Sequence, residues 1–132
     1  QDYQQLILLK RMVRDLQLPV QVSSGTIHRE SDGLAMSTRN RYLSPHERQV
    51  APRLHKELEN FSEALKAGRQ DYHALEADAS VALKAVGFKP EYVEVRRIID
   101  LSRPNGLKAT DGLIVMGAAW LGRARLIDNI QV

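Results

Sequence analysis

An unbroken apolar run at residues 113–121, near the end of the chain, most constrains how this sequence can fold. It is far too short to cross a membrane, which takes roughly 20 apolar residues. Its length and flanking turn signals are typical of a strand buried in the middle of a sheet. A β-branched segment at 92–99 precedes it and another at 125–130 follows it, with turn signals at 104–106 and at Gly122. We therefore predict a sheet of about three antiparallel strands.

A helix with strong local signals is predicted ahead of this sheet. Ser44 is its N-cap, Pro45 suits its first turn, and Glu47 completes a capping box. Pro52 should kink or restart the helix, because proline lacks the N–H that an interior helical position donates. Gly68 should end it. The apolar face consists of Val50, Leu54, Leu58, Phe61 and Leu65.

A second helix is predicted at residues 71–86 and should end at Gly87. The chain is 43% apolar, which is ordinary for a globular protein and provides the Leu, Ile and Val for a core. Helices packed on a three-stranded antiparallel sheet make an α+β fold. The core-facing residues of this helix are Tyr72, Leu75, Ala79, Leu83 and Val86.

The beginning of the chain has a different pattern. Asp2 is placed to cap a helix that runs to about Leu16, and a short apolar strand is predicted at 18–22. A helix followed by one strand is half of an α/β unit. We therefore expect this segment to be the tail of a larger domain. Its apolar stripe contains Leu6, Leu9, Val13 and Leu16.

Composition excludes several kinds of site. The chain has no cysteine, which excludes disulfides, thiolate nucleophiles and cysteine-ligated zinc. We predict no protein-bound metal, because no histidine pair has the i, i+4 spacing of a helical zinc motif. No Ser-His-Asp arrangement is visible. We expect Asp128 to anchor a turn or pair with an arginine, and Trp120 to be a core or interface residue. His46, His55 and His73 are predicted to be exposed helix residues, while His28 lies in a loop.

The long polar loop before Ser44 is the best candidate for a ligand site. Residues 32–40 combine a turn at Gly33 with two hydroxyls, Ser37 and Thr38, and the guanidinium of Arg39. Hydroxyls, backbone N–H groups and a bidentate arginine are suited to phosphate oxygens. An ordinary solvated loop has the same residue types, and is the more common explanation of the pattern alone. The net charge of +3 favours a local anion site over a long polyanion groove.

Four segments together resemble the pantothenate synthetase family: Asp2-Tyr3-Gln4-Gln5, residues 32–44, residues 118–122 and residues 125–129. They occur in the order and approximate spacing of that family, and the resemblance covers essentially the whole chain. It implies an enzyme that joins pantoate to β-alanine with ATP, through pantoyl adenylate, releasing AMP and pyrophosphate. It also implies a Rossmann-like domain with a His-x-Gly-His motif and a smaller C-terminal lid.

The resemblance assigns the loop its role. Met36, Ser37, Thr38 and Arg39 would occupy the position of the Lys-Met-Ser-Lys-Ser sequence of class I aminoacyl-tRNA synthetases. They would bind ATP, and Ser37 and Arg39 would act in catalysis by following charge onto the leaving pyrophosphate. The family's second serine is a threonine at Thr38, which keeps the hydroxyl.

Further roles follow from the same resemblance. Asp2 would meet the ATP ribose, Gln5 would hold pantoate, and the backbone at His28 would contact adenine. The family's phosphate-binding lysine corresponds to Gln1, which has no charge, so the contribution of that position is left open.

The resemblance divides the chain at about residue 26. Residues 1–26 would be the tail of the Rossmann-like domain and 27–132 the lid with its phosphate-binding loop. The His-x-Gly-His half of the active site is absent, so we expect the chain alone to be inactive. Its partners would be ATP with Mg²⁺, pantoate, β-alanine and its own N-terminal domain, in a cytoplasmic homodimer. The apolar face of the first helix should then cause self-association or disorder there.

Two other functions remain open at this point. The first is a non-catalytic binding module that reuses the lid surface. In the second, the basic residues around the loop, Arg29, Arg39 and Arg41, would bind nucleic acid, with an affinity that falls steeply with salt. Dispersed basic residues and few aromatic rings argue against the second alternative, and we predict neither nucleic-acid nor membrane binding.

Overall fold

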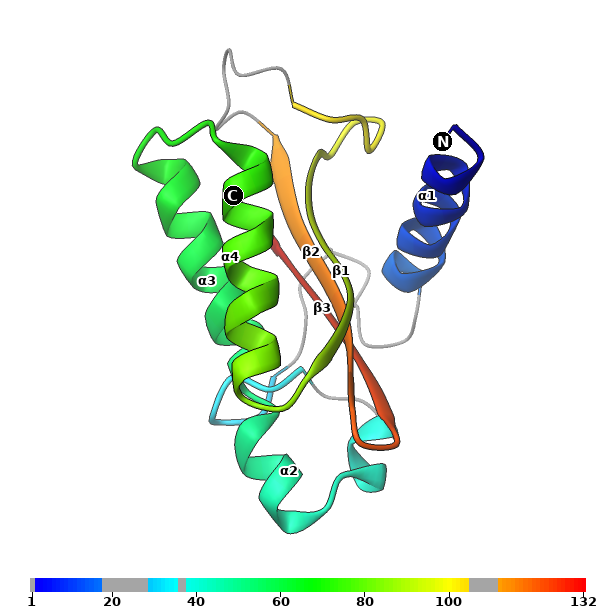
Figure 1. Ribbon diagram of the computed structural model, residues 1–132, viewed down its shortest axis with the longest axis vertical. Coiled ribbons are helices and arrows are strands. Elements are labelled where there is room, and N and C mark those ends of the chain that lie inside the picture. The colour runs from blue at the N-terminus through cyan, green and yellow to red at the C-terminus, as the bar shows by residue number, and fades with distance from the viewer. Residues whose placement is uncertain (1, 18–28, 36–37, 105–111) are drawn as a thin grey trace.

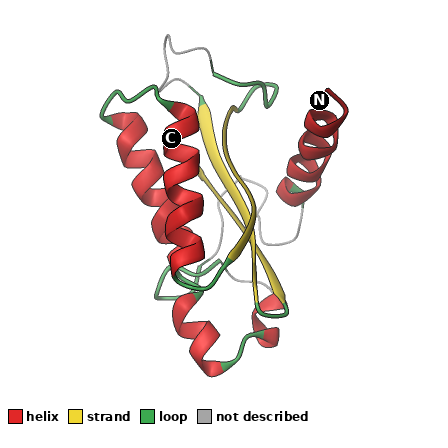
Figure 2. Cartoon of the chain, viewed as in Figure 1, coloured by secondary structure: helices red, strands yellow, loops and turns green. Residues whose placement is uncertain are grey.

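The computed structural model of the chain describes residues 2–17, 29–35, 38–104 and 112–132, with backbone alone at 2–5, 38 and 39. Within the described residues no helix is long and apolar enough to span a membrane. The fold is α+β, as predicted, with helices on both faces of one sheet (Figures 1 and 2). Its elements are α1 (Asp2–Leu16), η1 (Thr38–Tyr42), α2 (Pro45–Val50), α3 (Arg53–Lys66), α4 (Tyr72–Ala85), β1 (Lys89–Arg97), β2 (Leu113–Leu121) and β3 (Ala124–Gln131).

The sheet is antiparallel with the order β1-β2-β3, so the apolar run forms the central strand as predicted. β2 and β3 are joined through Gly122, whose positive φ of 58° suits the first position of a tight hairpin turn. β1 begins at Lys89, three residues before the predicted start. The register of β1 against β2 shifts between Pro90 and Tyr92, and this bulge interrupts the alternation on which the sequence prediction depended.

The predicted helix signals are confirmed. Ser44 and Glu47 form a complete capping box at the start of α2. α3 begins directly after Pro52, so the proline restarts the helix. α4 begins at Tyr72, and the carboxylate of Asp71 makes no cap bond because Arg69 holds it. The strand predicted at 18–22 lies outside the described residues.

The face of the sheet covered by α3 and α4 holds the main hydrophobic core (Figure 1). It includes the predicted face of the helices, since Leu54, Leu58, Phe61 and Leu65 are all buried. Apolar side chains from alternate positions of each strand complete the core, which is the arrangement expected for a sheet with one helix layer. These strand residues include Val93, Val95, Leu113, Val115, Leu121 and Leu126.

At Gly117 two leucines of α3 pack directly against the backbone of the central strand. A Cβ at this position would lie 3.3 Å from Leu54 Cδ1 and 3.3 Å from Leu58 Cδ2. We expect Gly117→Val to lower the free energy of unfolding by about 1–3 kcal/mol, because the added methyls overpack a filled interface. Gly117→Ala should cost less, since flexible leucine methyls can yield to one carbon. Urea unfolding measures both, and a valine variant as stable as the native chain would contradict the argument.

The opposite face of the sheet is covered by α1 (Figure 1). Met12 is fully buried there and packs with apolar side chains of all three strands. Two other apolar residues of α1 remain solvent-exposed: Leu6 at 49% and Val13 at 40%. The strand residues of this smaller core are Tyr92, Ile114, Met116, Ala118 and Ile127.

Polar contacts beside Met12 also join α1 to the sheet. Asp15 accepts hydrogen bonds from the Tyr92 hydroxyl at 2.6 Å and from Arg125 Nη1 at 2.8 Å. Arg125 Nε also donates to Glu91 at 2.8 Å, and so does Trp120 Nε1, at 2.8 Å. Burial and the bond to Asp15 raise the pKa of Tyr92 above its usual range. The hydrogen bond from Arg125, with that from Trp120, lowers the pKa of Glu91.

Trp120 was predicted to be a core or interface residue, and its position in the structure excludes the first of these. Its side chain belongs to the end of β2 and is 39% exposed, so it is not a core residue. The indole N–H needs a hydrogen-bond partner, and Glu91 at the bulge of β1 provides it at the sheet surface.

Candidate functional site

The segment before Met36 is a tight turn fixed by its own backbone. Glu30 N donates to Leu34 O at 2.7 Å, and Arg29 and Ala35 form an isolated antiparallel bridge. Gly33, where the sequence predicted a turn, has a φ of 95°. That left-handed conformation favours glycine, and a Cβ there would also lie 2.9 Å from His55 Cδ2. The turn is thus pressed against α3. We call residues 29–35 the leading arm of the loop.

The leading arm is attached to β3 by a buried ion pair. Arg29 donates to the two carboxylate oxygens of Asp128 at 2.6 and 2.8 Å, and also to Gly33 O at 3.1 Å. The Asp128 side chain is only 2% exposed. Asn129 N completes its hydrogen bonding at 2.7 Å. The prediction that Asp128 pairs with an arginine is confirmed, and Arg29 is consequently not a free cation for a ligand.

The segment after Ser37 is the short helix η1, where the sequence predicted only irregular loop. Asn40, in η1, donates from Nδ2 to Ala35 O at 3.1 Å, which connects the two sides of the loop directly. Tyr42 ends η1 and is 44% exposed. The guanidinium carbons of Arg41 and Arg123 lie 5.5 and 5.8 Å from the centre of its ring. η1 therefore joins the loop to the β2–β3 hairpin.

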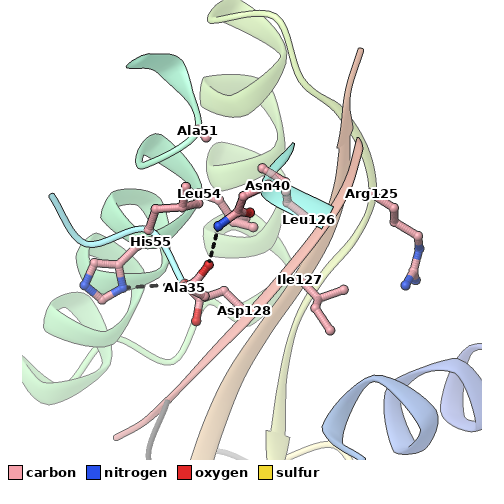
Figure 3. A pocket seen from close by; sticks show the side chains of 10 residues that line it. Ala35, Asn40, Ala51, Leu54, His55, Arg125, Leu126, Ile127 and Asp128 are labelled. Carbon is pink, nitrogen blue, oxygen red and sulfur yellow. Dashed lines mark hydrogen bonds and ion pairs between the residues drawn. The ribbon is translucent and has the colours of Figure 1, made fainter. Parts of the chain in front are cut away.

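A small cavity lies between these anchoring contacts (Figure 3). Leu34 and Ala35 of the leading arm line it, with Asn40 of η1, Leu54 and His55 of α3, and Asp128 of β3. It has about 10 Å³ for the centre of a water-sized molecule, which is room for a single water. The guanidinium of Arg125 points away from it (Figure 3).

His55 was predicted to be an exposed helix residue, and that prediction is wrong. Its side chain is 18% exposed, with Nδ1 3.7 Å from Asp128 Oδ2 and Nε2 3.5 Å from Glu59 Oε2. The turn at Gly33 covers the ring, and this contact comes from a distant segment that helical periodicity does not reveal. His73, at 94% exposure, and the exposed His46 agree with their predictions.

The outer side of the leading arm makes a separate, exposed ion pair. Arg48 of α2 donates to Asp32 at 2.6 and 3.1 Å. This hydrogen bonding lowers the pKa of Asp32 and raises that of Arg48. Both side chains are about a third exposed or more, so the pair contributes little to stability.

The structure places four of the predicted site residues by their backbone alone. Asp2 and Gln5 belong to α1, while Thr38 and Arg39 belong to η1. The N-terminal end of α1 and η1 lie toward opposite ends of the molecule (Figure 1), so the structure does not bring these pairs together. Four further predicted residues lie outside the described part of the chain: Gln1, His28, Met36 and Ser37.

Comparison with known proteins decides the family. The sequence profile described as pantoate–β-alanine ligase matches residues 1–131. The chain belongs to the pantoate–β-alanine ligase family. It is 48% identical over 131 residues to a pantothenate synthetase of Alkalilimnicola ehrlichii and 46% identical to one of Nitrosococcus oceani, in each case over 99% of this chain.

A solved structure of this family agrees with the fold. The crystal structure of pantothenate synthetase from Thermus thermophilus has a TM-score of 0.69 and 36% identity, over 98% of this chain and 46% of its own. The chain spans about 45% of the length of the curated pantothenate synthetases it matches. The resemblance predicted from four motifs is therefore confirmed at the level of the family.

Sequence reasoning missed the contacts that anchor the loop. It included Asn40 and Asp128 in its motifs without connecting them, and it treated Arg29 as one of several loop cations. The pairing of Arg29 with Asp128 joins residues 99 positions apart. The local signal was a carboxylate, Asp128, directly after the apolar residues Leu126 and Ile127 of a strand, since a buried carboxylate requires a partner.

Proposed function

We propose that the chain is the C-terminal part of an enzyme that condenses pantoate with β-alanine at the expense of ATP. Pantoyl adenylate would be the intermediate, with AMP and pyrophosphate as products. The observation that carries this proposal is the match of residues 1–131 to the pantoate–β-alanine ligase family. The chain spans about 45% of the length of its relatives, which is consistent with a further domain in the complete protein. In this proposal residues 1–26 are the tail of that domain and residues 27–132 are the lid.

In this proposal the loop binds the ATP phosphates. Ser37 and Thr38 donate hydrogen bonds, and Arg39 adds a charge-assisted fork that follows the charge developing on pyrophosphate. Because Asp128 neutralises Arg29, the positive charge of the loop comes from Arg39 and Arg41. ATP would arrive with Mg²⁺. No group of three or more metal-ligating side chains occurs in the described ranges.

The remaining assignments concern the first helix. Asp2 would contact the ribose, Gln5 pantoate, and the backbone of His28 adenine, with Gln1 in the place of a lysine. For one ATP to reach both Asp2 and Arg39, α1 would have to take a different position from the one it has on the sheet. The contacts of Asp15 with Arg125 and Tyr92, and the packing of Met12 on the sheet, would then have to open.

The experiment that tests the function uses the complete protein that contains this chain. We expect it to release AMP only when ATP, pantoate and β-alanine are all present, and we expect the 132-residue chain alone to release none. A Gln1→Lys version shows whether the missing charge limits the reaction. Folded complete protein that releases no AMP, with either residue at position 1, would replace this proposal with that of a non-catalytic binding module.

A further inference from the structure

We propose that Glu76, held in place by Arg103, closes the outer edge of β1 to strand addition, and that a second copy of this chain pairs there when the edge is opened. β1 lies at one end of the sheet order β1-β2-β3, so only one of its sides is hydrogen-bonded to a strand. An edge strand presents backbone N–H and C=O groups that can pair with another chain, and folded proteins block such edges. This inference does not depend on the proposed function.

The backbone groups on the outer side of β1 belong to alternate residues. Val95 N donates to Glu76 Oε2 at 3.0 Å, so it points away from β2. Arg97, two positions along, points the same way, because its N–H and C=O are both bonded to the turn at residues 101–102, each at 2.8 Å. That turn therefore folds back over the end of the strand. Val93 is two positions before Val95, so its N–H and C=O face the outer side as well.

Glu76 is placed at this edge by its helix and by its charge. It is one of the buried residues of α4, which packs against β1, and its side chain is 10% exposed. Arg103 donates to its two carboxylate oxygens at 2.5 and 3.2 Å. Since a buried carboxylate needs a partner, this arginine allows Glu76 to stay beside the strand. Val95 N is thus covered by a charge-assisted hydrogen bond, which is stronger than a bond between neutral groups.

The opposite edge of the sheet has a similar arrangement. At β3, Asn129 N donates to the Asp128 carboxylate at 2.7 Å, and Asn129 O accepts from Arg29 Nη2 at 3.4 Å. Arg29 also holds the Asp128 carboxylate with two hydrogen bonds. Each edge strand therefore has a buried carboxylate on one of its backbone N–H groups, with an arginine from another segment bound to that carboxylate. This repetition supports closure of the edge as the role of Glu76.

A second copy of the chain can occupy the edge of β1 once Glu76 is removed from it. Two copies of β1 related by a twofold axis run antiparallel, so Val93 of each can lie opposite Val95 of the other. Both residues direct their backbone groups to the outer side, and each such pair can exchange both of its N–H···O bonds. Glu94 would then face the Glu94 of the other copy, but Arg96 of its own chain already neutralises it, with bonds at 2.8 and 3.1 Å.

The test measures self-association of the Glu76→Ala and Glu76→Gln variants of this chain by sedimentation velocity at several protein concentrations. The alanine variant frees Val95 N, so we expect its association constant to exceed that of the native chain about 10- to 100-fold, the effect of one or two hydrogen bonds gained between the copies. Glutamine still offers an oxygen to Val95 N, so its association constant should stay within about twofold of the native value. Association through the apolar residues of α1 is common to all three proteins and cancels in the comparison.

Two further measurements separate an open edge from a weakened fold. Ala79→Gly weakens the same helix at another buried position without removing a group from the edge, and it should associate as the native chain does. By NMR, the Val95 amide of Glu76→Ala should exchange quickly in dilute solution and more slowly as the copies associate, whereas in the native chain its exchange should not depend on concentration.

Arg103→Met provides a second test that applies even if Glu76→Ala does not fold. Without its cation, Glu76 should release the Val95 amide, and the exchange of that amide should rise about three- to tenfold. The proposal is overturned if folded Glu76→Ala associates no more than the native chain, or if Arg103→Met leaves the exchange of Val95 unchanged.

Discussion

Replacing Arg125 with methionine should loosen α1 from the sheet and lower the free energy of unfolding by about 3 kcal/mol, the usual cost of removing one partner of a buried ion pair. Arg125 forms four side-chain hydrogen bonds, two to Asp15 and two to Glu91. The Asp15 side chain is 5% exposed and Glu91 is 21% exposed. Methionine keeps much of the packing volume and leaves both carboxylates without this cation.

Helix α1 can also leave the sheet when Arg125 is replaced, and this possibility determines how the loss of stability should be measured. If α1 leaves the sheet, Asp15 becomes hydrated, and the cost cannot exceed the free energy that holds α1 in place. Trp120 is the only tryptophan of the chain and donates to Glu91 beside Arg125, so its fluorescence reports this region. Urea unfolding followed by fluorescence should shift to lower urea. Circular dichroism should shift with it only if α1 and the main core unfold together.

Two variants make the measurement specific. Arg14→Met removes an exposed arginine of the same helix, and should change stability by no more than about 0.5 kcal/mol. The double variant Asp15→Asn, Arg125→Met should lose less free energy of unfolding than the sum of the two single losses. Asp15→Asn alone leaves the Arg125 cation without one of its partners, and Arg125→Met removes that cation. If Arg125→Met leaves both transitions where they were, the contact between α1 and the sheet has no energetic importance.

The parts of the fold that could be predicted are those with local causes. Ser44 and Glu47 form a capping box from residues three positions apart, and Pro52 restarts the helix because of its own ring. The central strand followed from an apolar run at 113–121. The start of β1 was missed because Glu91 sits at a bulge, which breaks the alternation that identifies a strand.

The candidate site depended on contacts that local patterns do not contain. The ion pair of Arg29 with Asp128 spans 99 positions, and the bond of Tyr92 to Asp15 spans 77. His55 was predicted to be an exposed helix residue, yet a left-handed turn at Gly33 covers it. The loop was identified as a candidate site by its residue types, and a specific role was proposed for it only because of the resemblance to a family.

The residue with the largest expected effect on activity is Arg39. In the complete protein we expect Arg39→Ala to lower kcat by about 10²- to 10³-fold, the range seen when one preorganised donor to developing negative charge is removed. Arg39→Lys should recover only part of the loss, because an ammonium group provides the charge without the planar fork. Steady-state AMP release, with saturating pantoate and β-alanine, measures both.

Arg41 provides the matched control two positions along η1. It is exposed, and its guanidinium carbon lies 5.5 Å from the centre of the Tyr42 ring. Arg41→Ala removes the same charge from the same short helix, so a general electrostatic attraction of ATP would be weakened about equally by either change. A specific role for Arg39 requires that Arg41→Ala stay within about threefold of the native rate, since the Arg41 guanidinium lies over the Tyr42 ring and would contribute only net positive charge to the loop. If the two alanine variants lose activity equally, the loop attracts the nucleotide by net charge, and Arg39 has no special place in the transfer of charge to pyrophosphate.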